Sequence, residues 1–162
     1  FPDFRSGEKT FQLLTQVSGR AGRGNKKGKV IIQTYEPENN VIKDSKEENY
    51  DLFYEKEINS RKVFSYPPFS KILNIGFSSE DEERLLEVSK NFYDEIKSQD
   101  VELYGPMPSM VYKVQKRFRM NIFVKGSKKK IDKFKLFLKK KLNRFNDTKV
   151  RIIVDIDPVN LM

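Results

Sequence analysis

Two chemically versatile residue types are missing from this 162-residue sequence. There is no cysteine, which excludes disulfides and cysteine-ligated metals. There is no histidine either, which removes histidine metal ligands and every catalytic dyad or triad that needs an imidazole. No apolar run approaches the roughly 20 residues of a membrane span. We therefore predict no metal site and no membrane span, and the first residue, Phe1 rather than Met, leads us to expect a longer parent protein.

Positive charge is distributed unevenly along the chain. The net charge is +9, yet residues 1–100 carry 16 Lys and Arg against 18 Asp and Glu. Residues 101–162 carry 16 Lys and Arg against only 5 Asp and Glu, a balance of +11. Such a concentration predicts a polyanionic partner for the last third of the chain. The alternative is a lysine-rich surface with no such partner.

The first part of the chain has a helical character. Apolar residues at helical spacing predict a helix over residues 8–23, which Gly22 and Gly24 end. A run of β-branched and aromatic residues over 30–35 predicts a short strand, and residues 38–62 follow a second helical pattern. Pro67-Pro68 ends this part. We therefore place the domain boundary near residue 66, which divides the chain into 1–66 and 67–162.

The second part alternates strands and helices. Strands are predicted at 71–77 and 101–104, with a loop over 105–108 and a hairpin that turns near Gln115–Lys116. Helices are predicted at 82–97 and 128–145, and a last strand at 149–156. This β-α-β-β-α-β order predicts a ferredoxin-like, split βαβ sandwich of the α+β type. Two helices would cover one sheet face and leave the other open.

One octet carries the strongest chemical signal: Gln16-Val17-Ser18-Gly19-Arg20-Ala21-Gly22-Arg23. Arg20 and Arg23, three residues apart on a helix, share one face. Small residues between them allow a second surface to approach closely. Guanidiniums presented in this way can contact the terminal phosphate of a nucleotide and neutralise charge during phosphoryl transfer. For the arginine pair alone, a helix end with favourably placed cations is the simpler interpretation.

The octet resembles motif VI, Q-x-x-G-R-x-G-R, of superfamily 2 helicases. Its flanks narrow the resemblance to the primosomal protein N′ family of replication-restart helicases. The matching stretches are Asp3-Phe4-Arg5, Thr10-Phe11-Gln12-Leu13-Leu14-Thr15, Tyr66-Pro67-Pro68-Phe69-Ser70, Gly105-Pro106-Met107-Pro108 and Val154-Asp155-Ile156-Asp157-Pro158. The resemblance covers essentially the whole chain. It implies that residues 1–66 end the second RecA-like helicase lobe with its exit helix, and that 67–162 form the C-terminal domain.

The same resemblance implies a function. The intact protein would be an ATP-dependent 3′→5′ DNA helicase that assembles the primosome at stalled forks, in the bacterial cytoplasm and at the nucleoid. Arg20, Arg23 and Gln16 would serve catalysis, and Gly19 with the two arginines would contact ATP, which the intact protein would bind together with Mg²⁺. Zinc would belong to a part of the protein outside this chain. Because no G-x-x-x-x-G-K-[ST] phosphate loop is present, we expect the chain alone to bind no ATP and to be inactive.

Two surfaces of the second part are candidate binding sites. Over 128–145, Lys129, Lys133, Lys140 and Arg144 fall on one side of the helix with Phe137 among them, a pattern typical of single-stranded nucleic-acid binding or of a solvated helix face. In the hairpin, Arg117, Arg119 and Asn121 alternate with apolar residues and are predicted to point away from the core. The resemblance implies that these three bind the acidic tail of single-stranded DNA-binding protein. Forked DNA and other primosome proteins are further implied partners.

Two other interpretations remain open from the sequence. The chain could be an autonomous nucleic-acid- or protein-docking module in which residues 1–66 are passive. It could also belong to a different superfamily 2 helicase, although the Tyr-Pro-Pro-Phe and Asp-Pro stretches argue against this. The sequence predicts neither fork-structure preference nor oligomeric state.

Overall fold

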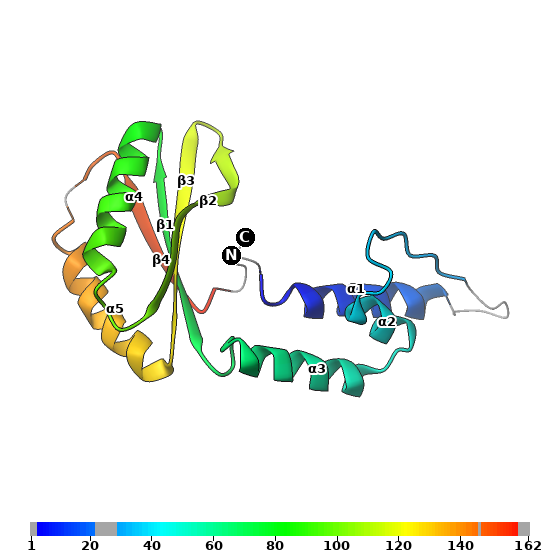
Figure 1. Cartoon of the computed structure of the whole chain (residues 1–162). Coiled ribbons are helices and arrows are strands. Elements are labelled where there is room, and N and C mark those ends of the chain that lie inside the picture. Colours follow the sequence, from blue (N-terminus) through cyan, green and yellow to red (C-terminus); the bar gives the residue numbers. More distant parts are fainter. Residues whose placement is uncertain (1–2, 22–28, 146, 159–162) are drawn as a thin grey trace. The chain divides into compact units, whose positions relative to one another are not determined.

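The computed structural model describes residues 3–21, 29–145 and 147–158 (Figure 1). The chain divides into two compact units, an N-terminal unit from Pro2 to Phe64 and a C-terminal unit from Ser65 to Met162. Arg23 and Gly22 of the octet lie outside the described residues. None of the described helices is long and apolar enough to cross a membrane.

Three helices make up the described secondary structure of the N-terminal unit: α1 (Ser6–Ala21), α2 (Asn40–Lys46) and α3 (Tyr50–Val63). The side chain of Asn39 accepts a hydrogen bond from the first turn of α2, and that of Asn49 does the same for α3. Between them Glu48 has a φ of 51°. The helical pattern expected over 38–62 therefore corresponds to two helices, because a second asparagine cap starts a new helix at Tyr50.

The N-terminal unit packs around a small apolar contact. The rings of Phe11 in α1 and Phe53 in α3 stack with centroids 4.3 Å apart. Arg61 donates to Glu8 and to Glu57, at 2.9 Å in each case, and so ties α3 to α1. Polar contacts thus hold much of this unit together.

The strand expected over 30–35 is wrong. None of the described residues of the N-terminal unit forms a strand, and the side chains of Ile31 and Tyr35 are 81% and 104% exposed. A strand needs a neighbour to pair its N–H and C=O groups, and the described part of this unit offers none. High β-propensity alone does not supply that pairing.

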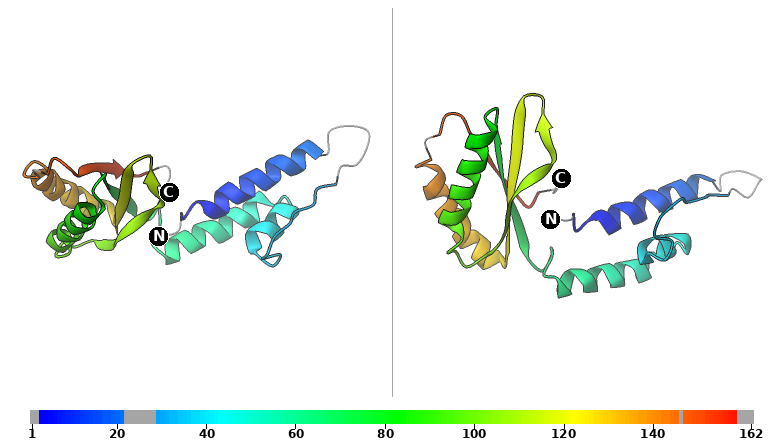
Figure 2. Two further views of the ribbon diagram at one scale, coloured as in Figure 1. Left: turned by 90° about the horizontal axis from the view of Figure 1, so that it is seen from above. Right: turned by 45° about the horizontal axis from the view of Figure 1, so that its top comes forward.

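The C-terminal unit contains a four-stranded antiparallel sheet. Its elements are β1 (Lys71–Ser79), α4 (Glu82–Ile96), β2 (Glu102–Val114), β3 (Arg117–Gly126), α5 (Lys128–Leu142) and β4 (Arg151–Ile156). The strand order is β2-β3-β1-β4, and each neighbouring pair is antiparallel. Both helices cover one face of the sheet (Figures 1 and 2). The α+β class and the β-α-β-β-α-β order are as predicted.

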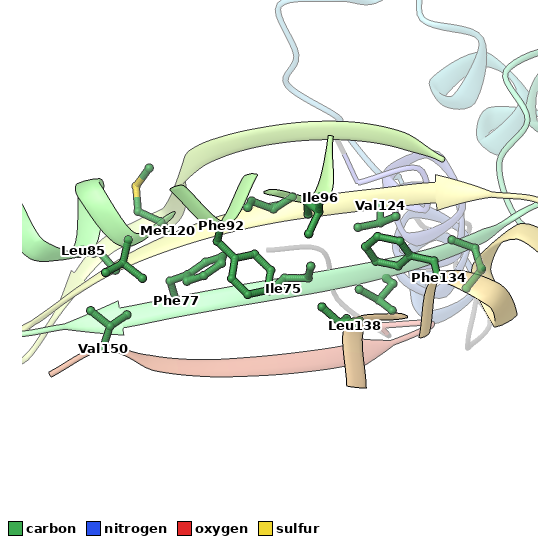
Figure 3. Packing of buried hydrophobic residues seen from close by; sticks show 14 residues of the cluster. Ile75, Phe77, Leu85, Phe92, Ile96, Met120, Val124, Phe134, Leu138 and Val150 are labelled. Atoms are coloured by element: carbon green, nitrogen blue, oxygen red, sulfur yellow. The ribbon is translucent and has the colours of Figure 1, made fainter. Parts of the chain in front are cut away.

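The core lies between the sheet and the two helices (Figure 3). Alternate residues of the central strands point into it, and the helices contribute one apolar stripe each. Its buried members are Leu73, Ile75, Phe77, Leu85, Val88, Phe92, Ile96, Met120, Ile122, Val124, Ile131, Phe134, Leu138 and Val150. The remaining residues of each strand therefore face the side of the sheet that the helices leave uncovered.

Strand β2 departs from the prediction. The expected loop at 105–108 lies inside β2, where the pairing register shifts between Tyr104 and Met107. Gly105 takes a φ of 116°, and a Cβ there would lie 2.7 Å from the backbone oxygen of Asn121. Only glycine fits such a position, so the turn-like composition marks a bulge rather than a loop. The hairpin turn itself falls at Gln115 and Lys116, as predicted.

Candidate functional site

The described part of the octet lies on an exposed face of α1. Gln16, Gly19 and Arg20 are all exposed, and their spacing of three and four residues places them on one side of the helix. Among the described residues outside the adjoining backbone of α1, no atom lies within 4 Å of the position that a Cβ on Gly19 would take. Within the described residues Arg20 forms no ion pair or hydrogen bond. The guanidinium is therefore free to meet a ligand.

Apolar side chains accompany these polar groups on α1. Leu13 is 61% exposed and Val17 is 51% exposed, and both lie within one turn of Gln16. Exposed apolar residues beside a free guanidinium indicate a surface that receives another protein surface. Arg20 is therefore available to a partner or ligand that approaches this surface.

The hairpin residues lie where their alternation predicts. Met120 and Ile122 of β3 are in the core, so Arg117, Arg119 and Asn121 face the uncovered side of the sheet. Arg117 is already engaged: its Nη2 donates to the backbone oxygen of Ser78 at 2.9 Å. Its Nη1 also lies 3.8 Å from Glu80. Arg117 is thus anchored to β1 rather than free.

Arg119 is the more available cation of this face. It is exposed and has no ion pair among the described side chains. Ser78 of β1 pairs with Arg119 on one side and with Arg151 of β4 on the other. Neighbouring strands lie about 4.8 Å apart, so the two arginines flank Ser78.

Sequence reasoning missed Arg151, because only strand order brings it beside Arg119. Its place beside Ile152, which packs against the core, indicates that it faces the uncovered side. The face therefore carries two exposed arginines, Arg119 and Arg151, and one anchored arginine, Arg117, at the end where the hairpin turns.

A buried cation, Lys125, lies at the other end of the same sheet face. Lys125 is 7% exposed, and its ammonium lies 3.0 Å from Glu102 and over the rings of Tyr66 and Tyr104. Burial would lower the pKa of Lys125, but the hydrogen bonds to Glu102 and Tyr104 raise it. Lys125 is therefore protonated, and its charge is neutralised by Glu102. The free positive charge of this sheet face is thus located near the hairpin.

The predicted cations of α5 are all exposed. Lys129, Lys133, Lys140 and Arg144 form no ion pair within the described part of the chain. Arg144 follows α5, which ends at Leu142, and the helical part from Lys129 to Leu142 extends over about 20 Å, at about 1.5 Å per residue. Other lysines of α5 are neutralised, for example Lys130 by Asp100 at 2.7 Å. The exposed row therefore retains its charge for a partner.

Phe137 lies differently from the prediction. It was expected among the solvent-facing cations, yet it is largely buried and packs against the core. Its ring centroid lies 6.1 Å from that of Phe134. Together with Lys140 and Arg144 it lines a groove between α4 and α5.

That groove also contains residues that the sequence did not single out, including Arg84 and Asn91 of α4. These positions flank the apolar stripe of α4, at helical spacing on the side that meets α5. The sequence signal for these residues was their position beside the apolar stripe of α4. To identify them as groove residues, one also had to know that α4 and α5 lie side by side.

The class of protein to which this chain belongs is defined by two parts. One is a helical unit that exposes Arg20, and the other is a strongly basic α+β domain. A family model described as the primosomal protein N C-terminal domain matches residues 62–159. This match covers more than half of the chain, so the chain belongs to that family.

Individual relatives agree over nearly the whole length. The chain is 36% identical to replication restart protein PriA of Bacillus subtilis, 35% identical to that of Borreliella burgdorferi and 32% identical to that of Synechocystis sp.. Each match covers 99% of this chain but 19–25% of the relative. The chain thus spans about a fifth to a quarter of the length of these proteins.

Proposed function

We propose that this chain is the C-terminal part of an ATP-dependent 3′→5′ DNA helicase that acts in replication restart. The observation that carries the proposal is the similarity to replication restart protein PriA over 99% of the chain. In this proposal residues 1–66 complete the second helicase lobe, and residues 67–162 form a domain that binds DNA and proteins. Bacterial cytoplasm is the corresponding location.

In the intact protein, Arg20 and Arg23 contact the phosphates of ATP, and Gln16 couples nucleotide to lobe position. The exposed, unpaired Arg20 and the open space above Gly19 support this role. ATP with Mg²⁺ supplies the free energy for unwinding, and the chain's own contribution is positioned positive charge.

The test is ATP turnover of the intact protein. Arg20→Ala or Arg23→Ala should reduce turnover by roughly 10³-fold while ATP binding changes little, by analogy with arginine fingers. Arg20→Lys should restore little, because an ammonium cannot fork onto two phosphate oxygens. Lys46→Ala, an exposed lysine of α2, is the matched control. Wild-type turnover in both arginine variants would refute the assignment.

The exposed cations of α5 are proposed to contact single-stranded DNA. Four unpaired cations, three of which lie along about 20 Å of α5, support non-specific contact with a phosphate backbone. If four or five phosphates are neutralised, the log–log salt slope of binding should be about −3, at roughly 0.7 per phosphate. Labelled oligonucleotide titrated at several salt concentrations measures it. No binding at low salt would remove DNA as the ligand.

A protein partner is proposed for the uncovered sheet face, namely the acidic tail of single-stranded DNA-binding protein. Arg117, Arg119 and Asn121 were predicted for this role, and Arg151 now joins them. Because Arg117 is anchored to Ser78, we assign the encounter with acidic residues to Arg119 and Arg151. A labelled tail peptide titrated against Arg119→Gln, with Lys116→Gln as control, should show at least about 10-fold weaker binding. An unchanged affinity would exclude Arg119.

An autonomous docking module is the second candidate. The C-terminal unit has a core made entirely of its own residues, which favours independent folding. If the intact protein neither hydrolyses ATP nor depends on Arg20, this candidate replaces the first.

A further inference from the structure

A groove of about 700 Å³ lies between the two helices of the C-terminal unit, on the side of the core away from the sheet. Its apolar lining comes from Val88 and Phe92 of α4, from Phe137 of α5 and from Phe145, which follows α5. The rings of Phe92 and Phe145 meet edge to face, with centroids 6.5 Å apart. The groove thus has an aromatic lining rather than a solely charged one.

Charge in the groove is divided between its two sides. The carboxylate of Asp147 holds Arg84 at 2.7 Å, and Lys141 is paired with Glu95, so these four groups neutralise one another. Lys140 and Arg144 line the groove without an ion pair in the described part of the chain. Free positive charge is therefore confined to the α5 side, where two phosphates could bind.

The α4 side of the groove carries a polar side chain whose hydrogen-bonding groups have no partner in the described part of the chain. Asn91 is exposed, and its amide has no hydrogen-bond partner among the described residues. An amide can both donate to and accept from the edge of a nucleobase. An acidic peptide fits this side less well, because Arg84, the cation of α4 that lines the groove, is already paired with Glu87 and Asp147. A base carries no negative charge there.

We propose that this groove receives an unstacked base of single-stranded DNA. The ring of Phe137 contacts the base, Asn91 contacts its edge, and Lys140 and Arg144 bind the adjoining phosphates. Lys129 and Lys133, which do not line the groove, bind phosphates only. The inference takes single-stranded DNA as its ligand from the proposed function and adds a base contact to it.

The test compares two ligands of equal charge, an oligothymidylate and an abasic strand of the same length, with the full chain at fixed salt. A base contact predicts about 5- to 150-fold weaker binding of the abasic strand, since stacking on an aromatic side chain contributes about 1–3 kcal/mol per base. Phe137→Leu keeps apolar packing but loses the ring, and should abolish most of this difference. Leu136→Ala, an exposed neighbour outside the groove, should preserve it.

Three further variants separate an effect of the groove from an altered fold. Asn91→Ala changes an exposed side chain and should reduce the preference for the oligothymidylate without changing thermal stability. Lys140→Gln should weaken both strands and reduce the salt slope by about 0.7. Lys139→Gln, a neighbouring lysine outside the groove, should leave the preference for the base-bearing strand unchanged.

The outcomes separate the two proposals. Equal affinity for both strands with a steep salt slope would overturn the base contact and leave the phosphate row of α5 standing. No binding of either strand would overturn both. Tighter binding of a glutamate-rich peptide that depends on Lys140, with the oligothymidylate unaffected by Lys140→Gln, would make the groove a peptide site and overturn the proposal.

Discussion

The two units of this chain differ in how they bury apolar residues. Among the described residues, sixteen of eighteen buried hydrophobic side chains belong to the C-terminal unit, and only Phe11 and Phe53 belong to the N-terminal unit. Large exposed hydrophobic side chains are divided almost equally, nine in the N-terminal and eight in the C-terminal unit. The smaller helical unit therefore exposes about as many large apolar side chains as the larger domain, although few of its described residues are buried.

The two units are therefore stabilised in different ways. The C-terminal unit has a continuous core between sheet and helices, which is sufficient for cooperative folding. The N-terminal unit relies on one ring stack and on ion pairs such as Arg61 with Glu8. Exposed residues such as Leu13 and Val17 indicate a surface that can contact another protein surface. Equivalent mutations in the two units should therefore have unequal effects.

The largest contrast is expected between Phe134→Ala and Leu13→Ala. Phe134 is 2% exposed in the core, so its truncation should lower the free energy of unfolding by about 3–5 kcal/mol. Leu13 is 61% exposed, and its truncation should change stability by no more than about 0.5 kcal/mol. Urea denaturation followed by circular dichroism measures both. Similar effects of the two variants would contradict the contrast between the units.

Much of the C-terminal fold could be predicted from its sequence. Periods of two and of 3.6 residues marked the strands and helices, because one face of each element is buried. The N-terminal unit was predicted less well. Its strand at 30–35 fails because pairing, unlike periodicity, is not local, and its second helix was hidden by Asn49, which caps a new helix rather than continuing the old one.

The candidate sites were predictable to the extent that they depend on a single element. Alternation placed Arg117 and Arg119 on the uncovered sheet face, and helical spacing placed Gln16 with Arg20. Contacts between two different elements could not be predicted from the sequence. The bond from Arg117 to Ser78 and the position of Arg151 beside Arg119 depend on strand order.

A smaller contrast comes from the buried carboxylate of the N-terminal unit. Asp44 is 3% exposed, and Lys56 donates to it at 2.6 Å. Lys56→Met should destabilise the N-terminal unit by about 1–3 kcal/mol, because a buried acceptor loses its charged donor. Hydrogen exchange of α2 and α3 amides should accelerate, while α4 and α5 are unchanged. Lys62→Met, an exposed lysine of α3, is the matched control, and equal acceleration in it would remove the role of the pair.

Helix caps give a contrast of about 1 kcal/mol. Asn49 and Ser127 each accept a hydrogen bond from the third residue of the helix that follows them, α3 and α5 respectively. Replacement of either by alanine should cost about 0.5–2 kcal/mol. For Ser127→Ala the cost should appear in the global unfolding midpoint, whereas for Asn49→Ala it should appear as faster exchange in α3 alone. A global shift in both would show that the units unfold together.

The smallest contrast between the two units concerns how their stability changes at low pH. Burial would raise the pKa of the Asp147 carboxyl, but hydrogen bonds from Arg84 and from two backbone N–H groups lower it below its ordinary value. The pKa of Asp3 is likewise lowered, where burial is opposed by Lys9 and by the backbone N–H of Arg5. A carboxyl with a lowered pKa in the folded state stabilises that state fully above its unfolded pKa, and this contribution is lost as the pH falls through the folded value.

Asp147→Asn should therefore lower the unfolding midpoint of the C-terminal unit at pH 7, and the difference from wild type should shrink as the pH falls below the ordinary aspartate value of 3.8. Asp3→Asn should leave that midpoint unchanged at every pH, because Asp3 belongs to the other unit. Its effect should be limited to the amides at the start of α1. Thermal melts between pH 3 and pH 7, combined with hydrogen exchange, distinguish the two. A constant offset for Asp147→Asn across this range would show that its carboxylate charge does not stabilise the fold, and that only the shape of the side chain matters there.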